Sequence, residues 1–151
     1  MQKSRIKTEQ KIIDAVATLL LSEGFPAVGI NAISRTAGCD KVLIYRYFGG
    51  LDGLLERFAQ QHDLWWQADE IMPTENDALD TLPRFLDALL KLHIKAIQQR
   101  ALTQEIMAWE MSASNPLTRS LSRQRTEQGM LLVKRVRQQF KQPNIDIGGI
   151  L

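Results

Sequence analysis

The chain has 151 residues, 44% of them hydrophobic and 24% charged, a composition typical of a packed globular protein and not of a disordered chain. Its net charge of +2 is unevenly distributed: seven Lys/Arg against four Asp/Glu (+3) over residues 1–50, five against nine (−4) over 51–100, and seven against four (+3) over 101–151. A single cysteine excludes an intrachain disulfide, and no apolar run reaches the roughly 20 residues that cross a bilayer. We therefore expect a cytoplasmic protein without a membrane partner, whose basic N-terminal part suits a polyanion.

Helical periodicity recurs along the chain, whereas alternating strand patterns with hairpin turns are nearly absent, so an all-α fold is predicted. The first helix is predicted from Thr8 to Glu23, with Thr8 as its N-terminal cap and Gly24 ending it in a left-handed conformation. Its apolar face consists of Ile12, Ile13, Val16, Leu19 and Leu20.

Two short helices are predicted next, over residues 30–37 and 41–48, with a tight turn at Gly38 between them. Asp40 stands where it can cap the second one, and a glycine pair directly after residue 48 ends it. Two short helices behind a longer one form a helix-turn-helix layout. Such a layout serves either DNA binding or a plain helical corner.

A longer helix is predicted from near Asp52 through Trp65 and Trp66 towards Glu70. The polar stretch that begins at Pro73 is predicted to separate an N-terminal head from a C-terminal body. The chain is thus expected to consist of a small three-helix head and a larger helical body.

Three further helices are predicted in the body, over residues 77–99, 101–111 and 116–140. Pro83 would lie in the first turns of the 77–99 helix, where a missing N–H does least harm. The chain then finishes "NIDIGGIL", and this apolar end is expected either to pack into a core or to lead into a helix that is missing here.

In a helix-turn-helix, the second short helix enters the major groove of DNA and its first residues meet base edges. A lysine there reaches guanine acceptors or a phosphate, apolar side chains contact thymine methyl groups, and tyrosine hydroxyls donate to phosphate oxygens. The candidate DNA-binding residues of the 41–48 helix are Lys41, Val42, Leu43, Tyr45, Arg46 and Tyr47.

The stretch "GFPAVGINAISRTAGCDKVLIYRYFGGLDGLL" resembles the DNA-binding head of the tetracycline-repressor (TetR) family of bacterial transcription regulators. The resemblance covers about residues 8–58, and it depends on several residues at fixed spacings. The matching residues are Gly24, Phe25, Ile33, Ala37, Gly38, Tyr45, Phe48 and Leu54.

The resemblance implies a DNA-binding domain over residues 1–50 and a helical regulatory and dimerisation domain over residues 51–151, incomplete at its C-terminus. It implies a homodimer of the full-length protein that represses transcription from a palindromic operator in double-stranded DNA and is released by a small-molecule effector. It also implies that Arg5, Lys7 and Asn31 contact the DNA, mainly through its backbone.

Three residues depart from the family pattern. Gly29 replaces a capping Thr that also binds phosphate, Val42 replaces a common Gly, and Leu51 replaces a Lys that touches the DNA backbone. Two phosphate contacts are therefore lost per head, and we expect weaker and less salt-dependent DNA binding than in typical relatives.

Candidate effector contacts are aromatic, Met and polar side chains of the predicted body helices. Each has a plainer alternative, because the apolar ones could be ordinary core, His93 could be a buried structural histidine, and Arg125 and Gln128 could pair with Glu110. The candidates are Trp66, His93, Met107, Trp109, Glu110, Arg125 and Gln128.

Enzyme function finds little support. We see no Ser/His/Asp set, phosphate-binding loop or metal-ligand spacing in the sequence, so no catalytic residue, metal or cofactor is expected. The alternative to a regulator is a helical architectural or interaction protein that uses a TetR-like head for non-specific DNA binding without an effector.

Overall fold

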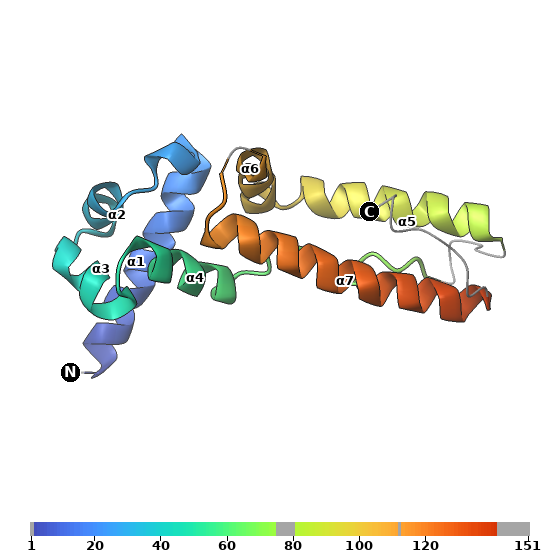
Figure 1. Cartoon of the computed structure of the whole chain (residues 1–151), viewed down its shortest axis with the longest axis horizontal. Helices are drawn as coiled ribbons and strands as arrows, with labels where there is room; N and C mark the ends of the chain where they lie inside the picture. Colours follow the sequence, from blue (N-terminus) through green and yellow to red (C-terminus); the bar gives the residue numbers. More distant parts are fainter. Residues whose placement is uncertain (1, 75–80, 112, 142–151) are drawn as a thin grey trace. The chain divides into compact units, whose positions relative to one another are not determined.

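The computed structural model describes residues 2–74, 81–111 and 113–141, which contain helices and no strand (Figure 1). Close contacts divide the chain into two units, described separately below. The first unit comprises the residues up to Leu64 together with Ala101–Leu121, and the second comprises Trp65–Arg100 and the residues from Ser122 onward. The elements are α1 (Gln2–Glu23), the short 3-10 helix η1 (Phe25–Ala27), α2 (Ile30–Ala37), α3 (Lys41–Phe48), α4 (Leu51–Gln61), α5 (Leu82–Gln98), α6 (Ala101–Glu110) and α7 (Pro116–Phe140).

Helix α1 begins earlier than predicted. Thr8 is not its cap: the helix already runs from Gln2, and the Thr8 hydroxyl donates to the carbonyl oxygen of Ser4, 3.0 Å away. The sequence offers no breaker before Thr8, so the helix extends towards the N-terminus. At the other end Gly24 has a positive φ of 77° but an extended ψ of 174°, so it leads into η1 and not into a left-handed turn.

The two short helices α2 and α3 have the predicted bounds. Gly38 lies between them in the left-handed conformation, at φ 62° and ψ 41°. Ile33 of α2 and Ile44 of α3 are completely buried, α2 packs on α1, and α3 packs on α4. The predicted apolar face of α1 is buried as well. The local signals of the helix-turn-helix therefore agree with its tertiary packing.

Helix α4 is shorter than predicted. It ends at Gln61, and Trp65 and Trp66 lie in an irregular segment after it, not on the helix. Both indoles are 1% exposed, because this segment packs into the core of the second unit. Tertiary packing thus prevents a continuation that the sequence pattern allowed.

Helix α6 belongs to the first unit, although the sequence assigned it to the body. Its Trp109 ring lies 6.3 Å from the ring of Phe25 in η1, and the Thr103 hydroxyl donates to the carbonyl oxygen of Leu64, 2.6 Å away. The helix ends at Glu110, one residue earlier than predicted. This division does not test the predicted boundary near residue 50 between the DNA-binding and regulatory domains, which stays a prediction.

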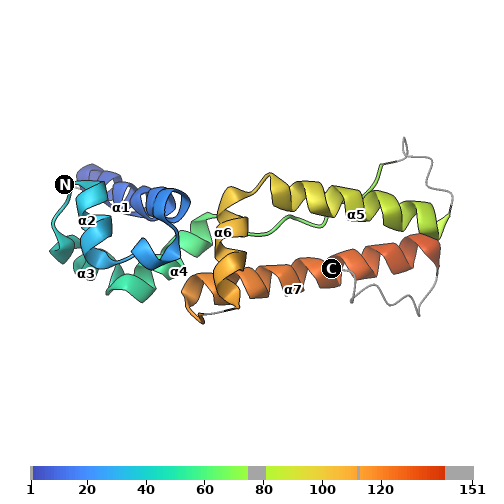
Figure 2. The ribbon, with the colours of Figure 1, turned by 90° about the horizontal axis from the view of Figure 1, so that it is seen from above.

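The second unit pairs α5 with α7, which run alongside each other in both views (Figures 1 and 2). Thr81 stands at the N-cap of α5, so Pro83 lies in the first turn as predicted. Phe85 of α5 packs edge-on against Phe140 of α7, with ring centroids 5.1 Å apart. The predicted helical residues 77–80 and the "NIDIGGIL" stretch lie outside the described residues.

Candidate DNA-binding surface and ligand groove

The turn between α2 and α3 is held by backbone and side-chain hydrogen bonds. The N–H groups of Gly38 and Cys39 donate to the carbonyl oxygens of Arg35 (3.1 Å) and Ser34 (3.0 Å), which closes α2. The Asp40 carboxylate then accepts from the Val42 N–H at 2.8 Å and caps α3. The start of α3 is therefore fixed in space, as a base-reading helix requires.

Helix α3 presents one side to solvent. Lys41 and Arg46 are exposed, Val42 is 60% exposed and Tyr45 is 55% exposed, whereas Ile44 is fully buried on the opposite side. The remaining predicted contacts on this helix, Leu43 and Tyr47, are half-buried. The buried face therefore anchors α3 to the head. The opposite face exposes the cationic groups, the valine side chain and the phenol of Tyr45 to solvent.

Arg5 of α1 lies against the last turn of α3. Its guanidinium carbon is 5.0 Å from the centroid of the Tyr47 ring, and its Nε donates to the Glu9 carboxylate at 2.6 Å. The hydrogen bond and the charge of Glu9 raise the pKa of Arg5, so the group stays cationic. Two of the predicted DNA contacts, far apart in the sequence, are thus neighbours in the structure.

The remaining two predicted contacts lie on the helices beside α3. Lys7 on α1 and Asn31 in the first turn of α2 are both exposed. Gly29, the N-cap of α2, has no side chain to cap the helix, and a Cβ built there would meet nothing within 4 Å. The space that a capping side chain would occupy is therefore open.

A cleft in the first unit adds a cation that the sequence analysis missed. It lies between α1, the end of α3 and α4, has a volume of about 380 Å³, and its lining includes Arg5, Tyr47 and Arg57. Glu9 and Glu56 also line the cleft, so its charges are mixed. No spacing signal connects Arg57 with Arg5, because only the tertiary fold brings α4 to α1.

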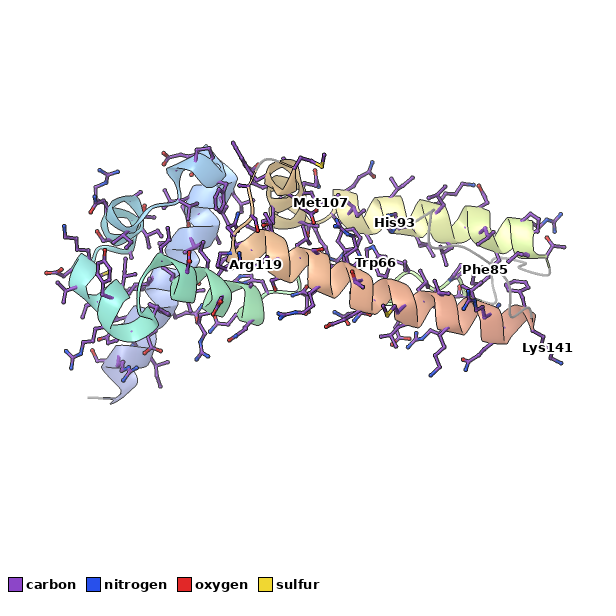
Figure 3. All side chains as sticks on the ribbon, in the orientation of Figure 1. Trp66, Phe85, His93, Met107, Arg119 and Lys141 are labelled. Atoms are coloured by element: carbon purple, nitrogen blue, oxygen red, sulfur yellow. The ribbon has the colours of Figure 1, made fainter. Side chains whose placement is uncertain are left out.

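In the second unit, two tryptophans and a histidine form a buried aromatic cluster. His93 of α5 lies edge-on to Trp65 and Trp66, with ring centroids 5.9 and 5.4 Å apart (Figure 3 labels Trp66 and His93). Burial lowers the pKa of His93, which favours its neutral form. Within the described part of the chain, both indole nitrogens and His93 Nδ1 are buried without a hydrogen-bond partner.

Glutamines of α7 hold the tryptophan segment. The side-chain oxygens of Gln124 and Gln128 accept from the backbone N–H groups of Trp65 (3.1 Å) and Ala68 (2.9 Å). Arg135 also bonds to Asp69. Gln128, predicted as an effector contact, thus has a structural bond, and Gln124, which the sequence analysis did not single out, has the same role.

A groove of about 930 Å³ follows one face of α7 in the second unit. It is lined by Trp66, by α7 residues between Arg125 and Gln138, and by Lys141 just after the helix. The Arg125 guanidinium carbon also lies 5.7 Å from the centroid of the Trp65 ring. Of the predicted effector contacts, Trp66 and Arg125 therefore share this groove, while His93 contacts it only through Trp66.

The other predicted effector contacts, Met107, Trp109 and Glu110, belong to α6 and hence to the first unit. The Trp109 indole N–H donates to the Glu105 carboxylate at 2.9 Å. The predicted effector set thus divides between the two units. The sequence pattern placed all these residues on body helices, but it carried no information about which unit α6 joins.

The residues that the structure describes contain no helix long and apolar enough to cross a membrane. The same residues include no group of three or more His, Cys, Asp or Glu side chains that could hold a metal ion.

The capped turn and the exposed face of α3 place the first unit in the class of helix-turn-helix proteins. Residues 12–58 match the family model of bacterial regulatory proteins, tetR family. This match confirms the resemblance of residues 12–58 to the DNA-binding head of the TetR family.

A curated relative and a solved structure extend this comparison. The chain is 28% identical over 91 residues to the HTH-type transcriptional regulator AlkX of Mycobacterium tuberculosis, a match that covers 60% of this chain and 41% of AlkX. It therefore spans less than half the length of that relative. The structure of NalD, the secondary repressor of the MexAB-OprM multidrug efflux pump in Pseudomonas aeruginosa, is similar with a TM-score of 0.54 and 17% identity, over 91% of this chain and 69% of NalD. This likeness confirms the predicted all-α fold.

Proposed function

We propose that this protein is a DNA-binding transcriptional regulator that inserts α3 into the major groove. The observation that carries this proposal is the exposed side of α3, where Lys41, Val42 and Tyr45 project from a helix that Asp40 caps and Ile44 anchors. Lys41 at the N-terminus of the helix is suited to guanine acceptors, and Val42 with Leu43 to thymine methyl groups. Base reading thus falls to the first turn of α3.

Contacts with the phosphate backbone would hold this helix in register. Tyr45 is exposed on α3, and the guanidinium carbon of Arg5 lies 5.0 Å from the centroid of the Tyr47 ring. Hydroxyl donors and cations position a protein on DNA without reading its sequence. Arg46, Lys7 and Asn31 add exposed polar or cationic groups on the same three-helix region.

At the level of the whole protein, we propose a repressor that acts as a homodimer on a palindromic operator and is released by a small-molecule effector. Residues 1–50 would bind DNA, and residues 51–151 would belong to the regulatory and dimerisation domain. Two heads must lie roughly 34–36 Å apart to engage successive major grooves. An effector weakens binding only as far as it prefers the state with a different spacing. A DNA target implies a cytoplasmic location.

Selection of bound duplexes from a random pool, at fixed salt concentration, tests this function. We expect enrichment of a short motif, present once for a monomer and twice with two-fold symmetry for a dimer. A Lys41→Ala variant is expected to lose the enrichment while keeping weak binding to all duplexes. Uniform affinity for every duplex would instead support the architectural alternative, in which the head binds DNA without reading it.

A further inference from the structure

The groove on α7 combines an apolar centre with basic ends. Gly129, Met130 and Val133 line its middle, while Lys134 and Lys141 line the part towards the C-terminus of the helix. Figure 3 labels Trp66 beside the middle of α7 and Lys141 at its C-terminal end. From Arg125 to Lys141 the helix rises roughly 24 Å, at about 1.5 Å per residue. The groove therefore extends over several turns of α7, which favours an elongated occupant.

The charge of the groove has one sign. Arg125, Lys134, Arg137 and Lys141 all line it, and its described lining contains no Asp or Glu. Lys134 and Arg137 are three residues apart on one face of α7, and Lys141 also lines the groove directly after the helix ends at Phe140. An occupant with an anionic group near these three cations would match the charge of the groove.

Trp66 adds a second, independent feature of a binding site. Its side chain lines the groove although the residue is only 1% exposed, and its indole N–H has no hydrogen-bond partner within the described part of the chain. Buried donors without a partner are rare and call for an explanation such as a bound ligand. The Arg125 guanidinium lies beside the neighbouring Trp65 ring, which gives this wall both aromatic surface and charge.

We propose that the α7 groove binds an elongated amphipathic anion, with its apolar body along Trp66, Met130 and Val133 and its anionic group against Lys134 and Lys141. An apolar chain suits the Met and Val surface, and a carboxylate or sulfonate suits the lysine ammonium groups. A ligand of this class would be the effector of the repressor proposed above, and only this effector role rests on the proposed function. Binding itself does not require DNA.

Two fluorescent probes with the same ring system test the binding step directly. Anilinonaphthalene sulfonate carries a negative charge, and phenylnaphthylamine is the same body without the sulfonate. We expect the unchanged chain to bind the sulfonate with one-to-one stoichiometry and more tightly than the neutral probe. Dodecanoate should displace the sulfonate, whereas dodecyltrimethylammonium should not. Equal affinity for the two probes would overturn the proposed charge preference.

Variants identify the place of binding. Lys134→Gln and Lys141→Gln should each weaken sulfonate binding roughly twofold to fivefold and leave the neutral probe unchanged. Lys95→Gln removes an exposed lysine of α5 that does not line the groove, and it should change neither probe. Gly129→Phe should fill the groove and weaken both probes, with helix content checked by circular dichroism. Sulfonate binding that survives both Gly129→Phe and the two lysine variants would contradict the assignment.

A second copy of the chain is the competing occupant. If light scattering shows a dimer that Met130→Glu converts to a monomer, the groove is an interface and the ligand proposal is wrong. Dodecanoate added to the DNA-binding assay then tests the effector role alone. Loss of DNA affinity in the unchanged chain, but not in Gly129→Phe, would support that role, whereas unchanged affinity with intact probe binding would overturn it.

Discussion

At the scale of single residues, the first turn of α3 separates base reading from backbone binding. Lys41 and Tyr45 are both exposed, but Lys41 lies at the helix N-terminus, which meets base edges, and Tyr45 lies one turn further along. A base contact changes the ranking of DNA sequences, whereas a phosphate contact changes affinity for all of them. The two side chains therefore make distinguishable predictions.

We expect Tyr45→Phe to weaken binding to selected and random duplexes by the same factor, about 1 kcal/mol or roughly fivefold, because one phosphate hydrogen bond is lost. Lys41→Ala should weaken binding to the selected duplex more than to random DNA, since it also removes a base contact. Titration of labelled duplexes at constant salt measures both. Equal losses on the two duplexes for Lys41→Ala would show that Lys41 does not read bases.

Gly29 offers a second test at residue scale. Its φ of −143° and ψ of 158° suit any residue, and an added Cβ would meet nothing within 4 Å. Gly29→Thr supplies the missing N-cap of α2, so the free energy of unfolding should rise by a few tenths of a kcal/mol. The resemblance to the TetR family implies that the hydroxyl also reaches phosphate, and DNA affinity should increase.

Gly29→Ala is the control, because it adds a Cβ at the same position without a hydroxyl. It should lower stability, since Ala is a much poorer N-cap than Gly, and it should leave DNA affinity unimproved. Urea unfolding and duplex titration measure the two quantities. If Ala and Thr raise DNA affinity equally, the added hydroxyl has no role in binding.

At the scale of elements, the junction of α3 and α4 depends on close backbone approach. A Cβ built on Gly53 in the first turn of α4 would lie 1.9 Å from the carbonyl oxygen of Phe48 at the end of α3. Gly49 and Gly50, both with positive φ, make the intervening turn. The packing of the reading helix on the rest of the head therefore requires a residue without a side chain at position 53.

Gly53→Ala is expected to destabilise the protein by about 1–3 kcal/mol, because α4 must shift away from α3. Gly129→Ala in α7 meets nothing within 4 Å and should instead stabilise by about 0.5–1 kcal/mol through its higher helix propensity. Thermal unfolding of the two variants gives the comparison. Stabilisation by both substitutions would show that α3 and α4 do not approach as closely as described.

Local signals explain which elements could be predicted. Helices α2, α3 and α7 have the predicted bounds, because Gly38, Asp40, the Gly49–Gly50 pair and Asn115–Pro116 are breakers or caps that act within a few residues. Asn115, for example, accepts from the Leu117 N–H at 2.9 Å. The end of α4 has no such local signal. The helix ends there because the following residues Trp65 and Trp66 pack against His93 of α5.

At the scale of the whole molecule, the buried His93 links stability to pH. Burial lowers its pKa below the ordinary value of 6.5, so below pH 6.5 the unfolded chain binds a proton that the folded second unit does not. The contribution of His93 to the free energy of unfolding is therefore fully present above pH 6.5 and decreases as the pH falls below 6.5. The effect belongs to the aromatic cluster and not to the DNA-binding surface.

Thermal unfolding near pH 7.5 and near pH 5.5, on either side of the ordinary histidine pKa, measures this effect. We expect the melting temperature to drop on acidification in the unchanged chain and to drop less in His93→Phe, which keeps an aromatic ring at the same place. His62→Phe serves as a control for the second histidine of the chain. An identical drop in His93→Phe and the unchanged chain would exclude His93 as the titrating group.

The sequence alone determined the helix-turn-helix, its capped reading helix and the family that it resembles, because caps, glycine turns and apolar periodicity are encoded within a few neighbouring residues. Only the tertiary structure decided that Arg5 lies on Tyr47, that α6 joins the first unit, and that Trp65 and Trp66 leave α4 to meet His93. These contacts join residues far apart in the chain, and their formation depends on which apolar faces bury each other. No local pattern of side chains specifies that choice.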